Sequence, residues 1–193
     1  MNALKRQELL SLEQYAQERA AFRARVIIHK HKRRVAIGDH ACLYFEDRLT
    51  IQYQIQEMLR IEKIFESRDI EEELKAYNPL IPDGNNWKAT FMLEYEDVEE
   101  RRIALGELQG VATKVWVRIG DRARVYAVAD EDMDRENAEK TSSVHFLRFD
   151  LGSEMVAQAK SGAAISCGID HPHYHHEMVL DTLTRAALVA DLA

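Results

Sequence analysis

The sequence predicts an α+β protein with a largely antiparallel sheet, an N-terminal helical segment and a C-terminal helix. Apolar residues recur at helical spacing mainly before residue 78, whereas short apolar or alternating runs separated by turn residues dominate after residue 88. Helices and strands also do not alternate in the order of regular βαβ units, which argues against a parallel sheet. We expect a single domain over 1–193, with a helical part over about 1–78 and a sheet-rich part over about 88–193.

Start and stop signals define the elements of the first part. Ser11 and Gln14 have the spacing of a capping box, which predicts a helix beginning there. Gly38 marks a hairpin-type turn between two short strands. Asp69 is a candidate N-cap, and Pro79 ends the helix that follows it. The expected order is a helix over 11–32, strands over 33–37 and 41–46, a helix over 50–66 and a helix over 69–78.

The second part begins with a loop over 78–87 that contains two of the three prolines. The next strand, over 88–95, alternates, with Ala89 and Phe91 on one face and Lys88 and Thr90 on the other. Asp97 is a candidate N-cap for a short helix that stops near residue 110. The remaining expected elements are strands over 111–119, 124–129, 144–151, 163–169 and 174–180, and helices over 153–160 and from 182 onward.

Composition and charge restrict the class of protein. Hydrophobic residues make up 46% and charged residues 31% of the 193 residues, which is typical of a globular chain and excludes a disordered one. The 33 acidic and 26 basic side chains give a formal net charge of −7. This balance argues against a protein that coats nucleic acid. We therefore do not expect nucleic acid as a partner.

The N-terminus and the cysteines predict the compartment. Residues 1–10 carry charges and lack the apolar core of a secretory signal, and the longest apolar stretches are too short to cross a membrane. Cys42 and Cys167 lie in apolar, strand-like contexts and do not form a disulfide or metal motif. We expect a cytoplasmic protein that does not associate with membranes.

A histidine cluster is the first candidate for chemistry. His171, His173, His175 and His176 are half of the eight histidines and follow a predicted strand. On an extended chain His173 and His175 share a face, so they could bind zinc or iron together with ligands from elsewhere. Asp170 could orient one of the rings from behind. The alternative is a polar, partly exposed strand end with solvated rings.

The third ligand of such a site must come from another part of the chain. His145 on a predicted strand and His40 beside the first turn are the candidates. Iron or zinc is therefore the expected cofactor of a site that combines His145 with the cluster.

A basic run over 19–34 is a candidate interaction surface. It contains Arg25, Arg33 and Arg34 and no acidic residue. Such a run is typical of a surface for an anion or an acidic partner. The alternative is a set of cations that stabilise a helix C-terminus and a solvated face. Because the whole chain is acidic, we expect a protein partner or a second copy rather than nucleic acid.

The loop over 78–87 is a candidate pocket wall. The side chains that could line it are Tyr77, Asn78, Asp83, Asn85, Asn86 and Trp87, since binding residues are frequent on long loops. The same residue types also satisfy ordinary turn chemistry. The sequence lacks the glycine-rich loops of ATP and dinucleotide sites and the nucleophile motif of serine hydrolases. These enzyme classes are therefore without support.

Several longer segments carry a resemblance to a known family. They are residues 22–26 (FRARV), 28–35 (IHKHKRRV), 53–60 (YQIQEMLR), 76–84 (AYNPLIPDG), 139–149 (EKTSSVHFLRF) and 168–172 (GIDHP). With these segments the chain resembles the bacterial domain-of-unknown-function family thirty-five-oh-one over nearly its whole length. The resemblance implies a setting beside a rubrerythrin and an iron–sulfur protein, but no catalytic residue. It also gives His145 and His171 more weight than His173 and His175.

Three functional hypotheses follow. The first is a metal-binding accessory protein in redox or peroxide handling, linked to a rubrerythrin and an iron–sulfur partner. The second is a metal-free interaction module, in which the basic run and the acidic segments over 66–73 and 130–139 dock partners. The third is an enzyme on a small anionic substrate, with Arg60 or Arg148 binding the anion and His145 acting as acid–base.

Overall fold

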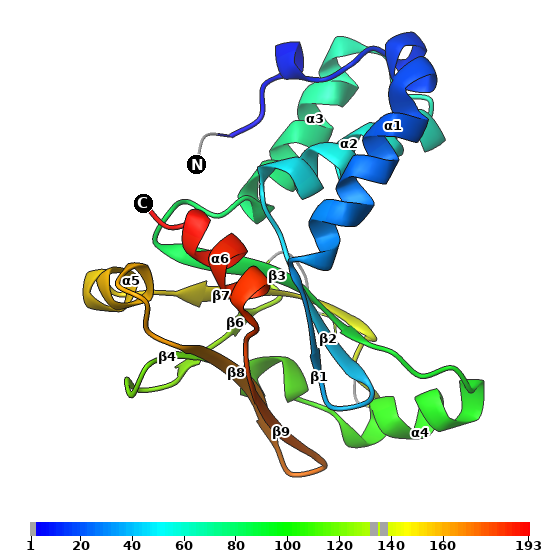
Figure 1. The fold of residues 1–193 in the computed structure, drawn as a ribbon. Coiled ribbons are helices and arrows are strands. Elements are labelled where there is room, and N and C mark those ends of the chain that lie inside the picture. The colour runs from blue at the N-terminus through cyan, green and yellow to red at the C-terminus, as the bar shows by residue number, and fades with distance from the viewer. Residues whose placement is uncertain (1–2, 132–134, 136–138) are drawn as a thin grey trace.

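The structure, a computed structural model, describes residues 3–131, 135 and 139–193. Figure 1 shows the first three helices gathered at one end of the molecule and the strands at the other, where the later helices lie beside them. We call the first three helices the helical lobe. They are α1 (Leu12–His31), α2 (Arg48–Ile61) and α3 (Ser67–Tyr77), preceded by the 3-10 turn η1 (Arg6–Glu8).

The strands form two antiparallel sheets. Sheet A has the order β1 (Arg34–Ile37), β2 (Ala41–Phe45), β3 (Asn86–Leu93), β7 (Val144–Asp150) and β6 (Val128–Ala129). Sheet B has the order β5 (Val125–Tyr126), β4 (Val115–Ile119), β8 (Ile165–His171) and β9 (Tyr174–Val179). The other elements are η2 (Asn78–Leu80), α4 (Val98–Glu107), η3 (Val111–Lys114), α5 (Ser153–Lys160) and α6 (Thr182–Ala190).

The α+β class, the N-terminal helices and the C-terminal helix are confirmed, but the strands divide into two sheets. The division occurs at the two strands expected over 111–119 and 124–129. The first residues of the former form η3, and Ala127 separates β5 in sheet B from β6 in sheet A. Strands β1 and β2 belong to sheet A, although they lie between helices of the N-terminal part.

Several helix ends differ from the expected positions. The Asp47 side chain accepts a hydrogen bond from the Thr50 backbone, so α2 begins earlier than expected. Lys63 has a φ of 54°, which breaks the helical path soon after α2 ends. Glu66 rather than Asp69 precedes α3, and Asp181 rather than Thr182 caps α6. The capping box at Ser11 is confirmed.

Burial follows the alternation expected for β3. Ala89 and Phe91 are buried in the main apolar core, together with side chains of both sheets, whereas Lys88 and Thr90 are half-buried on the opposite face. A second, smaller core lies among α2, α3 and the N-terminal segment and includes Ile51. This arrangement leaves one face of sheet A turned away from the main core. We call this face, which carries Lys88, Thr90, Phe146 and Arg148, the outer face of sheet A.

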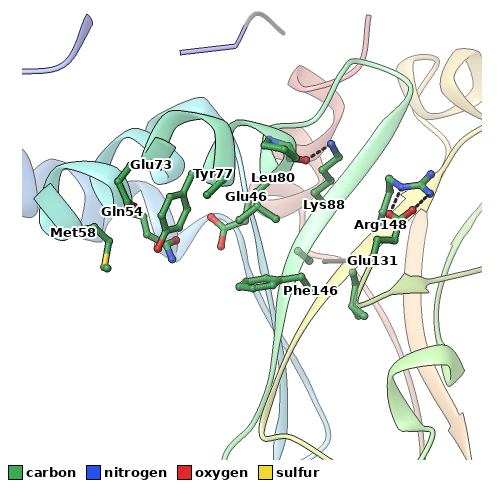
Figure 2. Close-up of a pocket in the computed structure, with 14 residues that line it drawn as sticks. Glu46, Gln54, Met58, Glu73, Tyr77, Leu80, Lys88, Glu131, Phe146 and Arg148 are labelled. Carbon is green, nitrogen blue, oxygen red and sulfur yellow. Dashed lines mark hydrogen bonds and ion pairs between the residues drawn. The ribbon is translucent and has the colours of Figure 1, made fainter. Parts of the chain in front are cut away.

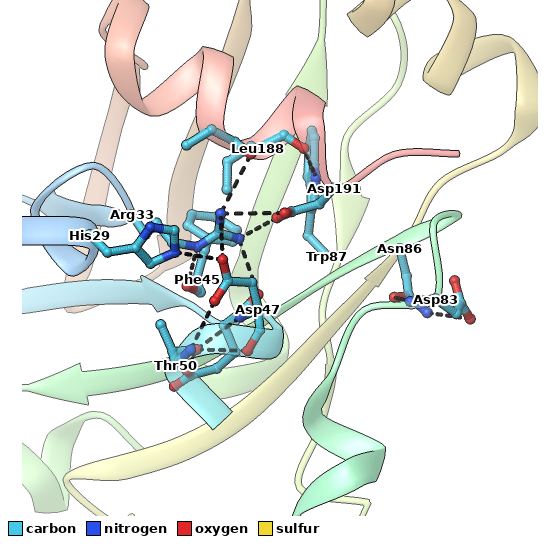
Figure 3. Close-up of polar contacts among 12 residues, drawn as sticks. His29, Arg33, Phe45, Asp47, Thr50, Asp83, Asn86, Trp87, Leu188 and Asp191 are labelled. Carbon is cyan, nitrogen blue, oxygen red and sulfur yellow. Dashed lines mark hydrogen bonds and ion pairs between the residues drawn. The ribbon is translucent and has the colours of Figure 1, made fainter. Parts of the chain in front are cut away.

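A buried ion-pair network joins the helical lobe to the rest of the molecule (Figure 3). Arg33, directly after α1, donates to the Phe45 carbonyl over 2.9 Å and pairs with Asp191 after α6. It also lies 3.4 Å from Asp47, which His29 contacts over 2.6 Å. Among the described residues, no helix is long and apolar enough to span a membrane.

Candidate functional site

A cavity of about 780 Å³ lies between the helical lobe and the outer face of sheet A (Figure 2). We call it the interlobe cavity. Its volume is within the range of small-molecule sites, roughly 300–1,000 Å³. Its walls are helices α2 and α3, the η2 turn, and strands β3 and β7. The lining residues used below are Glu46, Met58, Glu73, Tyr77, Lys88 and Phe146.

The strand register explains how side chains from distant parts of the chain meet in this cavity. Lys88 is paired with Arg148, and Thr90 is paired with Phe146, across β3 and β7. Paired residues of neighbouring strands project from the same face of a sheet. The alternation of β3 thus directs these four side chains toward the helical lobe, while Ala89 and its neighbours fill the main core.

Glu46 is a fixed carboxylate in the cavity wall. Its two oxygens accept hydrogen bonds from the hydroxyls of Thr50 (2.5 Å) and Thr90 (2.7 Å). Its backbone is also tied down, since its N–H donates to the Lys88 carbonyl and its own carbonyl accepts from Arg33. The side chain is 5% exposed. Contacts with several elements therefore hold this carboxylate in one orientation.

Glu73 and Tyr77 face the cavity from α3, next to Gln54 of α2 (Figure 2). Burial raises the pKa of Glu73, and the nearby carboxylates of Glu62 and Glu72 raise it further. Burial also raises the pKa of Tyr77, and the Glu73 charge adds to this shift. This wall of the cavity therefore combines partial desolvation with an accumulation of negative charge.

Lys88 lies at the opposite side of the cavity and is engaged by backbone carbonyls. Its Nζ donates to Pro79 over 2.5 Å and to Ile81 over 3.1 Å. Burial lowers the pKa of this amine, although the charge of Asp83 opposes the shift. The lysine thus fixes the η2 turn against β3.

Arg148 is also engaged. Its guanidinium binds Glu131 in a bidentate pair of 2.8 and 2.9 Å and also contacts Asp150. Arg60, the other arginine considered for an anionic substrate, is exposed and pairs with Glu57. The expected anion-binding arginines are therefore both occupied by carboxylates of the chain.

His145 does not face the interlobe cavity. It is fully buried on the other face of β7, with its ring 6.1 Å from that of Phe91. Nδ1 lies 2.5 Å from Asp130, and Nε2 lies 2.9 Å from the Ser142 carbonyl and 3.0 Å from the Thr141 hydroxyl. The protein therefore engages both ring nitrogens. This arrangement does not fit the expected roles of metal ligand and of acid–base toward the cavity.

The other expected ligands do not meet His145. His171 is buried, its Nε2 lies 2.9 Å from the Gln109 carbonyl, and its Nδ1 accepts from the His173 backbone. His175 lies 3.4 Å from Asp170, whereas the neighbouring His176 projects from the opposite face of β9 toward Gly38.

The described part of the chain does not bring together the side chains that were expected to bind a metal. There, no group of three or more His, Cys, Asp or Glu side chains is arranged to hold a metal ion. Asp170 binds Arg124 and Tyr126, over 2.6 and 2.7 Å, as well as approaching His175. The iron or zinc cofactor stays a prediction.

The structure places the three arginines of the basic run in different environments. Arg33 is 2% exposed inside the ion-pair network, which corrects its expected position on a partner surface. Arg34 is exposed on β1 and pairs with Glu94 and Tyr44. Arg25 is exposed on α1, where its guanidinium lies 4.7 Å from the Phe22 ring centre. A partner at Arg25 or Arg34 stays a prediction, and the expected acidic segment over 130–139 lies partly outside the described residues.

The expected pocket loop contributes differently from the prediction. The Asn78 side chain bonds the backbone of Leu4, and Asp83 accepts from Asn86 within the turn. Trp87 is fully buried and donates to the Leu188 carbonyl over 2.9 Å. These three side chains stabilise the fold, while neighbouring residues of the loop line the cavity.

Sequence reasoning missed Glu46, Glu73 and Phe146 as site residues, whereas Tyr77, one of the candidate pocket residues, does line the cavity. The alternation of β3 did place Lys88 and Thr90 on a polar face, and the same rule applied to β7 selects Phe146. No sequence pattern connects these strands to α3. That contact arises only because the helical lobe folds over the outer face of sheet A.

Comparisons with known proteins agree on the fold and leave the activity open. A family model described as "Protein of unknown function (DUF3501)" matches residues 3–192. The chain is 53% identical to a novel protein of unknown function from Burkholderia pseudomallei K96243, whose crystal structure superposes with a TM-score of 0.94 and covers 100% of both chains. A search of curated proteins gives no match.

Proposed function

The chain belongs to the DUF3501 family of proteins of unknown function, and we propose that it binds a small organic molecule in the interlobe cavity. The observation that carries this proposal is the cavity itself. It combines apolar side chains such as Met58, Leu80 and Phe146 with a few fixed polar groups. Binding sites for small molecules typically have this composition.

The position of the cavity supports the proposal. Its two walls come from the two parts of the molecule, so a ligand there contacts α2, α3, β3 and β7 together. Glu46 and Lys88 are held by several hydrogen bonds each, which orients polar groups before a ligand arrives.

A cavity-filling substitution tests the proposal. Ala76 is exposed on α3 and lines the cavity, so Ala76→Trp places an indole in the opening without disturbing the core. We expect the protein to enhance the fluorescence of a neutral apolar dye such as Nile red, and Ala76→Trp to weaken dye binding at least about tenfold, or ~1.4 kcal/mol. Ala20→Trp, on the exposed face of α1, is the matched control. Equal dye binding by all three proteins would overturn the proposal.

A metal-binding accessory role, with a rubrerythrin and an iron–sulfur partner, is the finer proposal that the histidines and the family resemblance suggest. Its ligands would have to include His173 or His175, because His145 and His171 have both ring nitrogens engaged and His176 projects from the opposite face of β9. Elemental analysis of untagged protein, purified without chelator, tests it. Near-stoichiometric iron or zinc that is lost in His175→Ala would support it, and metal content unaffected by that change would reject it.

A further inference from the structure

We infer that the ligand of the interlobe cavity carries a positively charged nitrogen, such as a primary ammonium group, attached to an apolar body. This inference rests on the proposed function and names the class of ligand that the same cavity takes. It follows from an imbalance between the carboxylates and the cations that line the cavity.

Two carboxylates of the cavity, Glu46 and Glu73, form no ion pair within the part of the chain that the structure describes. Glu46 is 5% exposed, and its carboxylate accepts hydrogen bonds from the hydroxyls of Thr50 and Thr90. A carboxylate has about four acceptor sites, so Glu46 retains capacity for further donors. An ammonium group from a ligand would supply both the missing charge and the missing donors.

Negative charge from α3 acts in the same direction. Glu73 faces the cavity, while Glu72 and the α2 end residue Glu62 are close enough to oppose its ionisation. A bound cation would relieve this repulsion, whereas a bound anion would increase it. The wall formed by Glu46 and Glu73 is therefore selective for positive charge.

The cations of the cavity, by contrast, are already engaged. Lys88 donates to two backbone carbonyls, and Arg148 binds the carboxylates of Glu131 and Asp150. An anionic ligand would have to compete with these contacts. A cationic ligand can bind Glu46 without breaking any of these contacts.

Apolar side chains define the rest of the ligand. Met58 and Leu80 line the helical side of the cavity, and the Phe146 ring lies on the sheet side (Figure 2). An aromatic or branched apolar body would cover these side chains while its ammonium group contacts Glu46. The ligand class is thus an apolar amine rather than a polyamine or a metal ion.

Three probes that share one body test the inference. They are 2-phenylethylamine as the cation, 2-phenylethanol as the neutral molecule and 3-phenylpropanoate as the anion. Calorimetric titration at pH 7 gives each affinity, and displacement of Nile red reports whether each probe enters the cavity. We expect the amine to bind at least about tenfold more tightly than the alcohol, and the anion to bind most weakly.

Charge-neutralising variants identify the recognising groups. Glu46→Gln is expected to weaken amine binding by about 10- to 100-fold and alcohol binding by much less. Because Glu46 is buried, Glu73→Gln, at a half-buried position of α3, serves as a second variant, with an expected loss of several-fold. Glu71→Gln, exposed on the same helix, is the matched control and should leave the amine affinity unchanged.

The outcomes separate this inference from the proposed function. Equal binding of amine and alcohol, with both lost in Ala76→Trp, would overturn the charge selectivity and leave the cavity as a binding site. Dye binding that is lost in Ala76→Trp, without binding of any probe, would have the same meaning. Absence of both dye and probe binding would overturn the cavity function together with the inference.

Discussion

Glu57 shows how single residues stabilise the helical lobe. Its carboxylate accepts hydrogen bonds from the Tyr15 hydroxyl over 2.6 Å and from Arg19 over 2.8 and 2.9 Å. The Arg19 hydrogen bonds, and then that of Tyr15, lower the pKa of Glu57 from its ordinary 4.5 to about 2. This side chain of α2 therefore binds α1 in its ionised form.

The lowered pKa gives a prediction with a defined sign. A carboxyl whose pKa is lower in the folded state stabilises the fold fully above pH 4.5, and this contribution is lost as the pH falls toward 2. We expect Glu57→Gln to lower the free energy of unfolding by about 2 kcal/mol at pH 7, and to approach the stability of the wild type near pH 2. Urea unfolding at a series of pH values measures this.

The control for this prediction is Glu18→Gln, an exposed substitution on α1. It should change the free energy of unfolding by less than about 0.5 kcal/mol. A constant difference between wild type and Glu57→Gln from pH 7 to pH 2 would contradict the assigned role.

The histidines mark the limit of prediction at the residue scale. The sequence predicts a strand over 163–169 with His171 just after it, whereas His171 is the last residue of β8. The sequence also contains no information on where a ring nitrogen points. In the fold His145 is engaged by Asp130 and Ser142, and His171 by Gln109, which is 62 residues away. Such partners depend on tertiary contacts, so histidines that are clustered in the sequence need not have ring nitrogens available to bind a metal.

At the scale of elements, the sequence predicts helix starts and strand faces better than it predicts which strands pair. The capping box at Ser11, the cap at Asp97 and the alternation of β3 all correspond to features of the structure. The split of the strands over 125–129 between two sheets does not follow from them. Its cause is the pairing of β6 with β7, a long-range contact, while β5 keeps the local hairpin pairing with β4.

The junction of α1, α2 and α6 gives the prediction at this scale. The Arg33 side chain is 3% exposed and pairs with Asp47 and Asp191. Burial raises the pKa of Asp191. We expect Arg33→Met to lower the free energy of unfolding by about 3–5 kcal/mol, because two buried carboxylates lose their cation. Thermal or urea unfolding measures the loss.

Arg34→Met is the matched control, since Arg34 is the next residue and its ion pair with Glu94 is exposed. Its expected cost is at most about 1 kcal/mol. If both variants were equally stable, the network would not hold the lobes together as described.

At the scale of the whole molecule, the interlobe cavity depends on how two separately predictable parts are joined. The helices and strands are each visible in the sequence, and so are their apolar faces. The angle at which α2 and α3 meet the outer face of sheet A is set by tertiary contacts such as Arg33 with Asp191 and Lys88 with the η2 carbonyls. The sequence therefore predicts the helices and strands that form the walls of the interlobe cavity, but not the cavity itself.

The most direct test of the account is a crystal structure of the protein soaked with 2-phenylethylamine. The account predicts density for the amine inside the interlobe cavity, with its nitrogen about 2.7–2.9 Å from a Glu46 carboxylate oxygen and its ring against Phe146. An empty cavity at saturating amine, or the amine bound with its nitrogen turned toward Lys88 and Arg148, would contradict it.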